Sequence, residues 1–144
     1  MAYLLDVDVL IARCDPTHEF HERVRDWLRE HAGRPIVLCP ATEMNFVRVF
    51  GSAEYPGGPG SPEAAIGVLR LMYKRLNAVF AHDDLSLRNE GQFATFAGVE
   101  PRDVQAVYLL TLAASRGVQF VTLNARLDPR LLPKAAAKAL TVIR

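Results

Sequence analysis

The segment from Val118 to Leu123 follows Gly117 directly, contains no charged residue and is dominated by apolar side chains. A strand that is buried on one face only alternates apolar and polar residues with a period of two. A clean alternation is missing here, which is typical of a strand covered by helices on both faces, and such strands belong to parallel sheets. This segment therefore predicts an α/β fold with a buried parallel sheet.

The rest of the chain adds further strands and helices in alternation. Helices are predicted to begin after Asp15, at Pro40, after Ser61 and at Pro101, because each position carries a capping residue or a proline suited to a first turn. The predicted strands are 3–11, 36–39, 79–80, 118–123 and 140–143, and the predicted loops are 51–61 and 88–98. This order predicts a three-layer α/β/α architecture around a central, mostly parallel sheet of about five strands.

The composition favours one compact domain spanning residues 1–144. Half of the residues are hydrophobic, which is enough for a sizeable core at this length. The formal net charge is +1, so the chain lacks the strong basic bias of a protein that coats nucleic acid. Cys14 and Cys39 match neither a disulfide framework nor a zinc-ligand spacing, and no apolar run reaches the ~20 residues of a membrane span. We therefore expect a soluble protein of the reducing cytoplasm, without contact to membranes.

Two acidic residues, Asp6 and Asp8, follow the first apolar residues of the chain. If the strand continues through them, both carboxylates aim at one point, because side chains two residues apart share a face. The alternative is that Asp8 ends the strand and caps the next segment. Ligands of open parallel sheets bind beyond the carboxyl ends of the strands, where Glu43 and Asn124 also fall. Carboxylate oxygens at this edge predict a site for a hard cation such as Mg²⁺.

Six segments of the chain, taken in order, resemble the PIN domain of the VapC toxin type. They are LLDVDVLI at 4–11, HEFHERVRDWL at 18–28, ATE at 41–43 followed by RV at 48–49, DDLS at 83–86, YLLTLA at 108–113 and VTLN at 121–124. Each segment alone is a weak signal, whereas the ordered set covers nearly the whole chain. The resemblance implies a PIN-like fold for residues 1–144.

The same resemblance implies an activity and partners. It implies an endoribonuclease that cleaves RNA with Mg²⁺ or Mn²⁺ and is neutralised by a VapB-type antitoxin. It also implies a homodimer, the state in which members of this family are often found. The metal ligands of the family fall on Asp6 and Glu43 of this chain, and Asp8 stands where the family often has asparagine. Such a metal lowers the pKa of its bound water and neutralises charge that develops on the phosphate. The resemblance thus implies a metal held by Asp6, Asp8 and Glu43.

Two positions depart from the family pattern. Ala106 stands where the family places an acid before the YLL run, and Asn124 stands where it places an acid after the Thr-Leu pair. Alanine offers no oxygen, while the Asn124 amide can coordinate or hydrogen-bond without adding charge. Asp103 lies one helical turn before Ala106, ~4.5 Å along the axis, which is too far to replace a ligand without rearrangement. The expected catalytic residues are Asp6, Asp8, Glu43, Asp103 and Asn124.

Basic and apolar side chains suggest where the partners bind. Arginines near strand ends or helix starts are candidates for contacts to RNA phosphates. The expected RNA-binding residues are Arg13, Arg48 and Arg126. For the antitoxin, an apolar groove is expected on the helices that carry Phe46, Phe50, Leu69, Met72 and Tyr73, with core packing of part of this surface as the alternative.

Two other functions are compatible with the sequence. The loss of acids at 106 and 124 favours a PIN-like domain that has lost catalysis and binds RNA or protein. The DVD pattern at 6–8 also fits a haloacid dehalogenase-type phosphotransferase, in which the first acid is the nucleophile and the second the acid/base. That class needs a strand-end Thr or Ser and then a lysine before a late acidic pair, whereas Thr122 here follows Asp83 and Asp84.

Overall fold

The fold is built around a five-stranded parallel sheet with the strand order β3-β2-β1-β4-β5. The computed structural model describes residues 1–93, 96, 98–127, 130, 132 and 134–144. The strands are β1 (Tyr3–Leu5), β2 (Ile36–Leu38), β3 (Val79–Phe80), β4 (Gln119–Thr122) and β5 (Leu140–Val142). The buried parallel sheet predicted from the sequence is confirmed.

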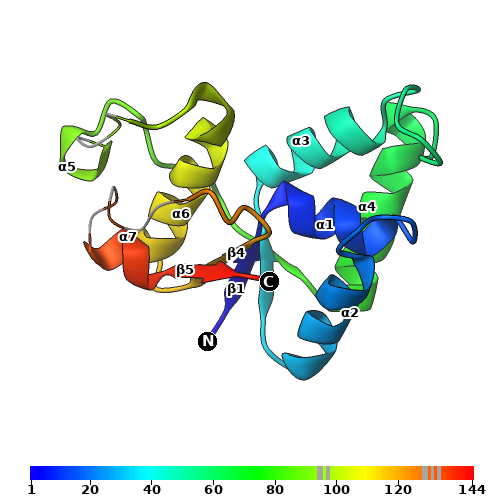
Figure 1. Ribbon diagram of the computed structural model, residues 1–144, viewed down its shortest axis with the longest axis horizontal. Helices are drawn as coiled ribbons and strands as arrows, with labels where there is room; N and C mark the ends of the chain where they lie inside the picture. The colour runs from blue at the N-terminus through cyan, green and yellow to red at the C-terminus, as the bar shows by residue number, and fades with distance from the viewer. Residues whose placement is uncertain (94–95, 97, 128–129, 131, 133) are drawn as a thin grey trace.

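Helices cover both faces of this sheet (Figure 1). They are α1 (Val7–Cys14), α2 (His21–Glu30), α3 (Pro40–Phe50), α4 (Pro62–Leu76), α5 (Glu90–Phe93), α6 (Val104–Ser115) and α7 (Lys134–Lys138), with a 3₁₀ turn at Pro101–Asp103 before α6. The first four helices lie on one side of the sheet, and α6 and α7 lie on the other. The predicted three-layer α/β/α architecture is therefore confirmed.

The two central strands divide their side chains between two apolar cores. In β1, Tyr3 and Leu5 pack with α1 to α4, whereas Leu4 packs with α6 and α7. In β4, Val121 belongs to the first core and Phe120 to the second. All five side chains are buried, which explains why these strands show no solvated face in their sequence.

The first strand is shorter than the sequence predicts. β1 ends at Leu5, and the carboxylate of Asp6 accepts a hydrogen bond from the backbone N–H of Val7 (2.8 Å) as the N-cap of α1. A carboxylate at this position satisfies a helix N–H and interacts favourably with the positive end of the helix dipole. The predicted strand through Ile11 is therefore wrong, and Asp8 lies in the first turn of α1. The residue that follows the strand and caps the helix is Asp6 rather than Asp8.

The second helix begins later than predicted. Asp15 does not start a helix but accepts hydrogen bonds from the backbone N–H and the hydroxyl of Thr17 (2.9 and 2.8 Å), and α2 begins only at His21. A side chain that bonds its own backbone offers a local turn in place of a helical one, which accounts for the delay. The predicted starts of α3 and α4 are confirmed, and α6 ends just before Gly117, whose positive φ of 68° suits a helix stop.

The short helices α5 and α7 are absent from the sequence-based prediction. α5 lies in the 88–98 segment, so the loop predicted there is wrong for Glu90–Phe93, and residues 94, 95 and 97 of that segment lie outside the described residues. α7 has the sequence KAAAK, which shows no apolar periodicity. The predicted loop at 51–61 is confirmed. Across the described ranges, no helix combines the length and apolar character needed to cross a membrane.

Candidate active site

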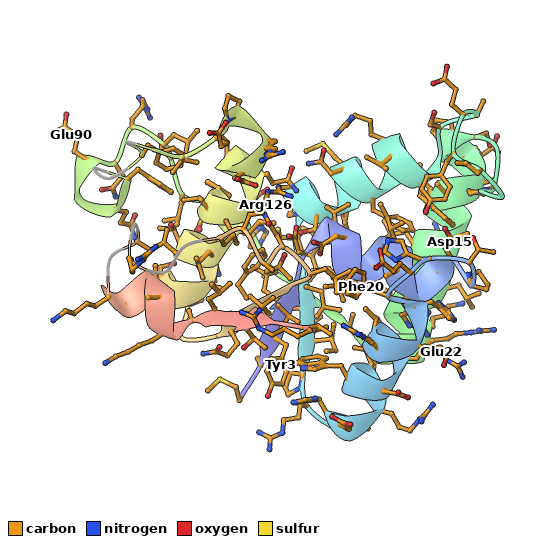
Figure 2. The ribbon with its side chains drawn as sticks, in the orientation of Figure 1. Tyr3, Asp15, Phe20, Glu22, Glu90 and Arg126 are labelled. Carbon is orange, nitrogen blue, oxygen red and sulfur yellow. The ribbon has the colours of Figure 1, made fainter. Side chains whose placement is uncertain are left out.

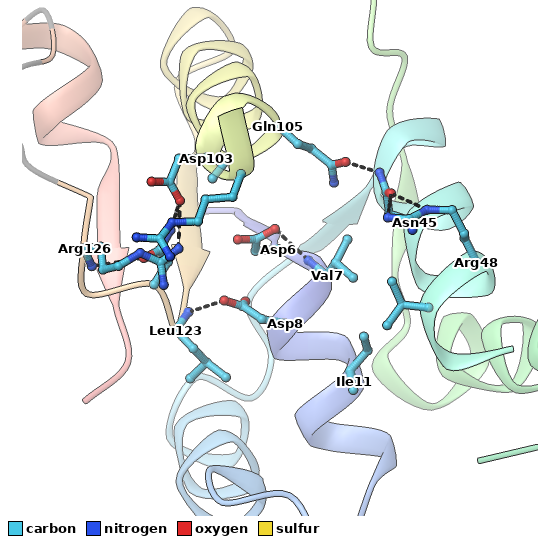
Figure 3. Close-up of a pocket in the computed structure, with 14 residues that line it drawn as sticks. Asp6, Val7, Asp8, Ile11, Asn45, Arg48, Asp103, Gln105, Leu123 and Arg126 are labelled. Atoms are coloured by element: carbon cyan, nitrogen blue, oxygen red, sulfur yellow. Dashed lines mark hydrogen bonds and ion pairs between the residues drawn. The ribbon is translucent and has the colours of Figure 1, made fainter. Parts of the chain in front are cut away.

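A cleft of about 410 Å³ opens at the carboxyl ends of β1 and β4 (Figure 3). The chain leaves β1 toward one side of the sheet and β4 toward the other, so the cleft lies where the strand order reverses, the usual ligand site of open parallel sheets. Its polar lining consists of Asp6, Asp8, Asn45, Arg48, Arg102, Asp103, Gln105, Asn124 and Arg126. Ala106 also lines it, so the residues that stand in for the two family acids both face this cleft.

The two aspartates at the start of α1 meet around one hydroxyl group. The Oγ1 of Thr122, at the end of β4, lies 2.7 Å from Asp6 Oδ2 and 3.2 Å from Asp8 Oδ2, and its single hydrogen can serve only one of them at a time. The backbone N–H of Leu123 donates to Asp8 Oδ2 at 3.1 Å. Thr122 is fully buried, so β4 holds both carboxylates in place from the interior side of the cleft. Sequence reasoning missed Thr122, although a hydroxyl at the end of a buried strand was a usable signal.

Burial raises the pKa of both carboxylates. For Asp6, loss of solvation is the main cause, and the bonds from Thr122 and Val7 oppose it. For Asp8, loss of solvation and then the negative charge of Asp6 raise the pKa to about 7. The buried Oδ1 of Asp8 accepts no hydrogen bond from any described residue. Among the described residues, no basic side chain lies within salt-bridge distance of Asp6 or Asp8. A proton or a cation between the two carboxylates would therefore relieve their repulsion.

The free energy of unfolding is expected to fall as the pH rises from about 4 to about 7. In this interval the folded protein keeps a proton on Asp8 that the unfolded chain has already lost, so a rise in pH favours the unfolded state. A difference of ~3 pKa units corresponds to roughly 4 kcal/mol at most. Urea unfolding at about pH 5 and about pH 8 measures the effect. Asp8→Asn should make the fall smaller and leave the part that comes from the raised pKa of Asp6, so an equal fall in the variant would contradict the assignment.

Asp103 enters the cleft from the 3₁₀ turn before α6 and is neutralised there. Its Oδ1 accepts hydrogen bonds from Asn124 Nδ2 and from the guanidinium of Arg126, each at 2.9 Å. The Asn124 Oδ1 in turn accepts from the backbone N–H of Arg126 (3.0 Å). Asp103 is buried; Arg126 supplies the opposite charge, and the neutral amide of Asn124 adds a hydrogen bond. Asn124 is consequently engaged on both ends of its amide and helps to position Asp103.

Glu43 lies apart from the aspartate pair. Its Oε2 accepts a 2.5 Å hydrogen bond from the hydroxyl of Tyr73 on α4, and burial together with this contact raises the pKa of Tyr73. Glu43 lines an apolar hollow between α3 and α4 instead of the cleft. The structure thus does not bring Glu43 to Asp6 and Asp8, as the sequence led us to expect.

A divalent metal fits this site through two carboxylates. Within the described residues, no group of three or more histidine, cysteine or acidic side chains is arranged to hold a metal ion. Asp6 and Asp8 nevertheless offer adjacent oxygens, and the buried Asp8 Oδ1 lacks a described partner. Mg²⁺ commonly keeps several waters and needs only one or two protein carboxylates. The donor set therefore suits Mg²⁺ or Mn²⁺ held by this pair.

The amide side chains opposite the aspartates were not anticipated from the sequence. Asn45 on α3 contacts Gln105 on α6, and the Asn45 Oδ1 accepts from the guanidinium of Arg48 at 2.9 Å (Figure 3). The Asn45–Gln105 contact joins the two helices, whereas the Arg48 contact lies within α3. Of the arginines expected to bind RNA, Arg48 and Arg126 line the cleft, whereas Arg13 is in the last turn of α1 and lines a different hollow.

The apolar groove expected for an antitoxin is mostly core. Phe46, Phe50 and Met72 are buried and pack with α1 and β1, so for these three the alternative of core packing holds. Leu69 also belongs to this core but lines the hollow between α3 and α4 as well. The helical spacing of these residues does not distinguish a face that packs inward from one that binds a partner. Exposed apolar side chains on α3 and α4 are found elsewhere, at Met44 and Ile66.

A parallel α/β/α fold with an aspartate pair at the switch point, Asp6 buried and Asp8 half-buried, is consistent with a PIN-like domain. The chain is 34% identical over 148 aligned positions to Ribonuclease VapC38 of Mycobacterium tuberculosis, covering 97% of this chain and 99% of the relative. Ribonucleases VapC44 and VapC39 of the same organism are 32% and 31% identical, over 99% and 88% of this chain and 100% and 91% of the relatives. The chain therefore belongs to the VapC family. No protein-family model matches it. These relatives give no support to a phosphotransferase of the haloacid dehalogenase type.

Proposed function

We propose that this protein is an endoribonuclease of the VapC toxin type that cleaves RNA in the cleft at Asp6 and Asp8. The observation that carries the proposal is the aspartate pair around Thr122, in which the buried Oδ1 of Asp8 has no partner among the described residues. Three arginines of the same cleft, Arg48, Arg102 and Arg126, supply the positive charge that an RNA backbone needs. An acid pair bordered by cations is suited to a phosphodiester substrate.

The residues of the cleft have different roles in the proposed hydrolysis. The arginines bind phosphate oxygens on either side of the reacting group and fix its position. Burial and the charge of Asp6 raise the pKa of Asp8 to about 7, and a cation bound between the two carboxylates would lower it, so both would be ionised as ligands. Thr122 keeps Asp6 and Asp8 together. Asp6 and Asp8 would hold a divalent cation, which would supply Lewis acidity and lower the pKa of a bound water.

We also propose the partners that the family membership suggests. A VapB-type antitoxin would neutralise the nuclease, and the protein would act as a homodimer in the cytoplasm, with residues 1–144 forming one domain. A hollow of about 580 Å³ between α3 and α4, lined by Met44, Val47, Pro62, Ile66 and Leu69, is a suitable groove for an apolar segment of the antitoxin. Cys14 and Cys39 are both free thiols, which agrees with a reducing compartment.

The purified protein is expected to cleave a mixed, structured RNA when Mn²⁺ or Mg²⁺ is present and to stop when EDTA is added. The reason is that Asp6 and Asp8 repel each other unless a proton or cation lies between them. Gel analysis of labelled RNA measures the rate, and a generic aryl phosphate, which should not be hydrolysed, serves as the control substrate. A folded protein that binds Mn²⁺ but leaves RNA intact would instead be a PIN-like binding module without catalysis.

A further inference from the structure

We propose that a second recess, at the far end of α1 from the aspartate pair, binds the phosphates of the RNA strand outside the cleft. This inference rests on the proposed function, because it extends the binding surface of the same substrate. The recess has a volume of about 450 Å³ and lies between α1, α2 and α4. It is lined by Arg13, Arg25, Arg29 and Arg75 with His21, and we call it the arginine hollow. In Figure 2, Glu22 marks α2 beside it, whereas Arg126 marks the cleft.

The arginine hollow concentrates positive charge in a chain whose net charge is only +1. No acidic side chain lines it. Arg25 and Arg29 reach Glu22 and Asp26 one turn earlier on α2, at 3.5 and 3.2 Å, but these pairs are exposed and such pairs contribute little. Over the described ranges, neither Arg13 nor Arg75 lies within salt-bridge distance of a carboxylate.

Helix dipoles explain part of this arrangement. Arg13, Arg29 and Arg75 lie in the last turns of α1, α2 and α4, where a cation interacts favourably with the negative helix end. That effect acts on each arginine separately and falls off within one turn. It does not account for four guanidinium groups around one recess, because like charges in a concave site repel and favour a bound anion. The shared recess is therefore the feature that points to a ligand.

The surroundings of the hollow favour RNA over an acidic peptide as that ligand. Guanidinium groups match phosphate oxygens in planar, paired contacts. Arg13 and Arg75 also line an adjoining recess of about 200 Å³, whose other walls include Val68, Leu71 and Met72. An apolar recess next to a phosphate site suits an unpaired nucleobase, whereas a run of acidic side chains offers no apolar group to bury there. α1 is ~12 Å long, so the cleft and the hollow, which lie at its two ends, can contact one RNA strand.

The test compares two double variants that each remove two exposed or half-buried positive charges. Arg13→Gln with Arg75→Gln alters the hollow, and Arg34→Gln with Arg70→Gln is the matched control on the exposed surface. Fluorescence anisotropy with EDTA present measures binding of labelled single-stranded RNA of about 20 nucleotides and of about four nucleotides. We expect the hollow variant to bind the long RNA ~10-fold more weakly and to lower the slope of log K against log salt by ~1.4, with the short RNA unaffected.

Several outcomes decide the matter. Equal weakening of long and short RNA, equal effects of the two double variants, or no effect would each overturn the proposal. Polyglutamate binding to the unmodified protein that is lost in the hollow variant, with binding of long RNA equal in the two proteins, would assign the hollow to an acidic polypeptide and also overturn it. Binding that depends on the hollow, in a protein that cleaves no RNA, would support this inference while the nuclease function fails. Urea unfolding checks folding, and the single variant Arg75→Gln, on the exposed end of α4, repeats the test if the double variant is unstable.

Discussion

Asp6→Asn is expected to lower the rate of RNA cleavage at least ~100-fold at saturating Mn²⁺ while leaving the protein folded. Asn is as good an N-cap as Asp, so the hydrogen bond to the backbone N–H of Val7 can persist. The substitution removes one of two carboxylates that face each other across Thr122, and with it half of the charge available to a cation. Single-turnover cleavage of labelled RNA measures the loss.

A matched control separates loss of this charge from loss of any acid. Asp84→Asn removes an exposed carboxylate whose partner, Arg116, lines neither the cleft nor the arginine hollow, so cleavage should be unchanged. The free energy of unfolding of Asp6→Asn should rise near pH 8, because the repulsion with Asp8 is gone. Cleavage by Asp6→Asn at the unmodified rate would show that the aspartate pair is not the catalytic centre.

Ala106→Asp combined with Asn124→Asp is expected to tighten Mn²⁺ binding ~10-fold or more and to raise the cleavage rate, because metal affinity follows the number of charged ligands. Ala106 lines the cleft, and Asn124 now donates its amide to Asp103 at 2.9 Å. After the double substitution this side of the cleft would hold three carboxylates in place of one. Isothermal titration with Mn²⁺ and the RNA cleavage assay provide the two measurements.

The same double substitution should destabilise the metal-free protein. Asn124→Asp turns a hydrogen bond to Asp103 into a repulsion between carboxylates, and Ala106 is buried. Mn²⁺ should therefore raise the unfolding midpoint of the variant more than that of the unmodified protein. Ala106→Asn, with position 124 unchanged, adds similar volume without charge and should leave Mn²⁺ affinity as it is. Unchanged affinity and cleavage in the doubly acidic variant would mean that the missing acids do not limit this site.

The position of the cleft follows from strand order, which the sequence shows well. Asp6 and Asn124 come directly after apolar strands, and parallel neighbours bring such positions to one edge. The predicted strand was too long, but Asp8 was still placed correctly at this edge of the sheet. A helix that starts after Asp6 and a strand that continues through Asp6 both keep Asp8 close to Asp6. Asp103 also reached the cleft, since its neighbour Ala106 lies one turn further along the same wall.

The details of the site depend on contacts between distant segments. Glu43 has the expected position near the start of α3, but the hydroxyl of Tyr73, thirty residues later, draws its carboxylate toward α4. Asp103 forms an ion pair with Arg126, which lies in the segment after β4. The residue spacing within α3 or before α6 does not predict these partners. Each contact depends on how two distant segments pack and on the rotamers that this packing allows.

By itself, the sequence determined the α/β class, the parallel sheet and the approximate place of the acids. Burial on both faces and helix-capping chemistry act locally, so they leave apolar runs, prolines and capping residues along the chain. Only the tertiary structure decided that Asp8 has a pKa of about 7, that Glu43 stays outside the cleft, and that the arginines around Arg13 share one recess. These properties arise from solvent exclusion and from charges that folding brings together, and neither can be predicted from residues that are neighbours in the sequence.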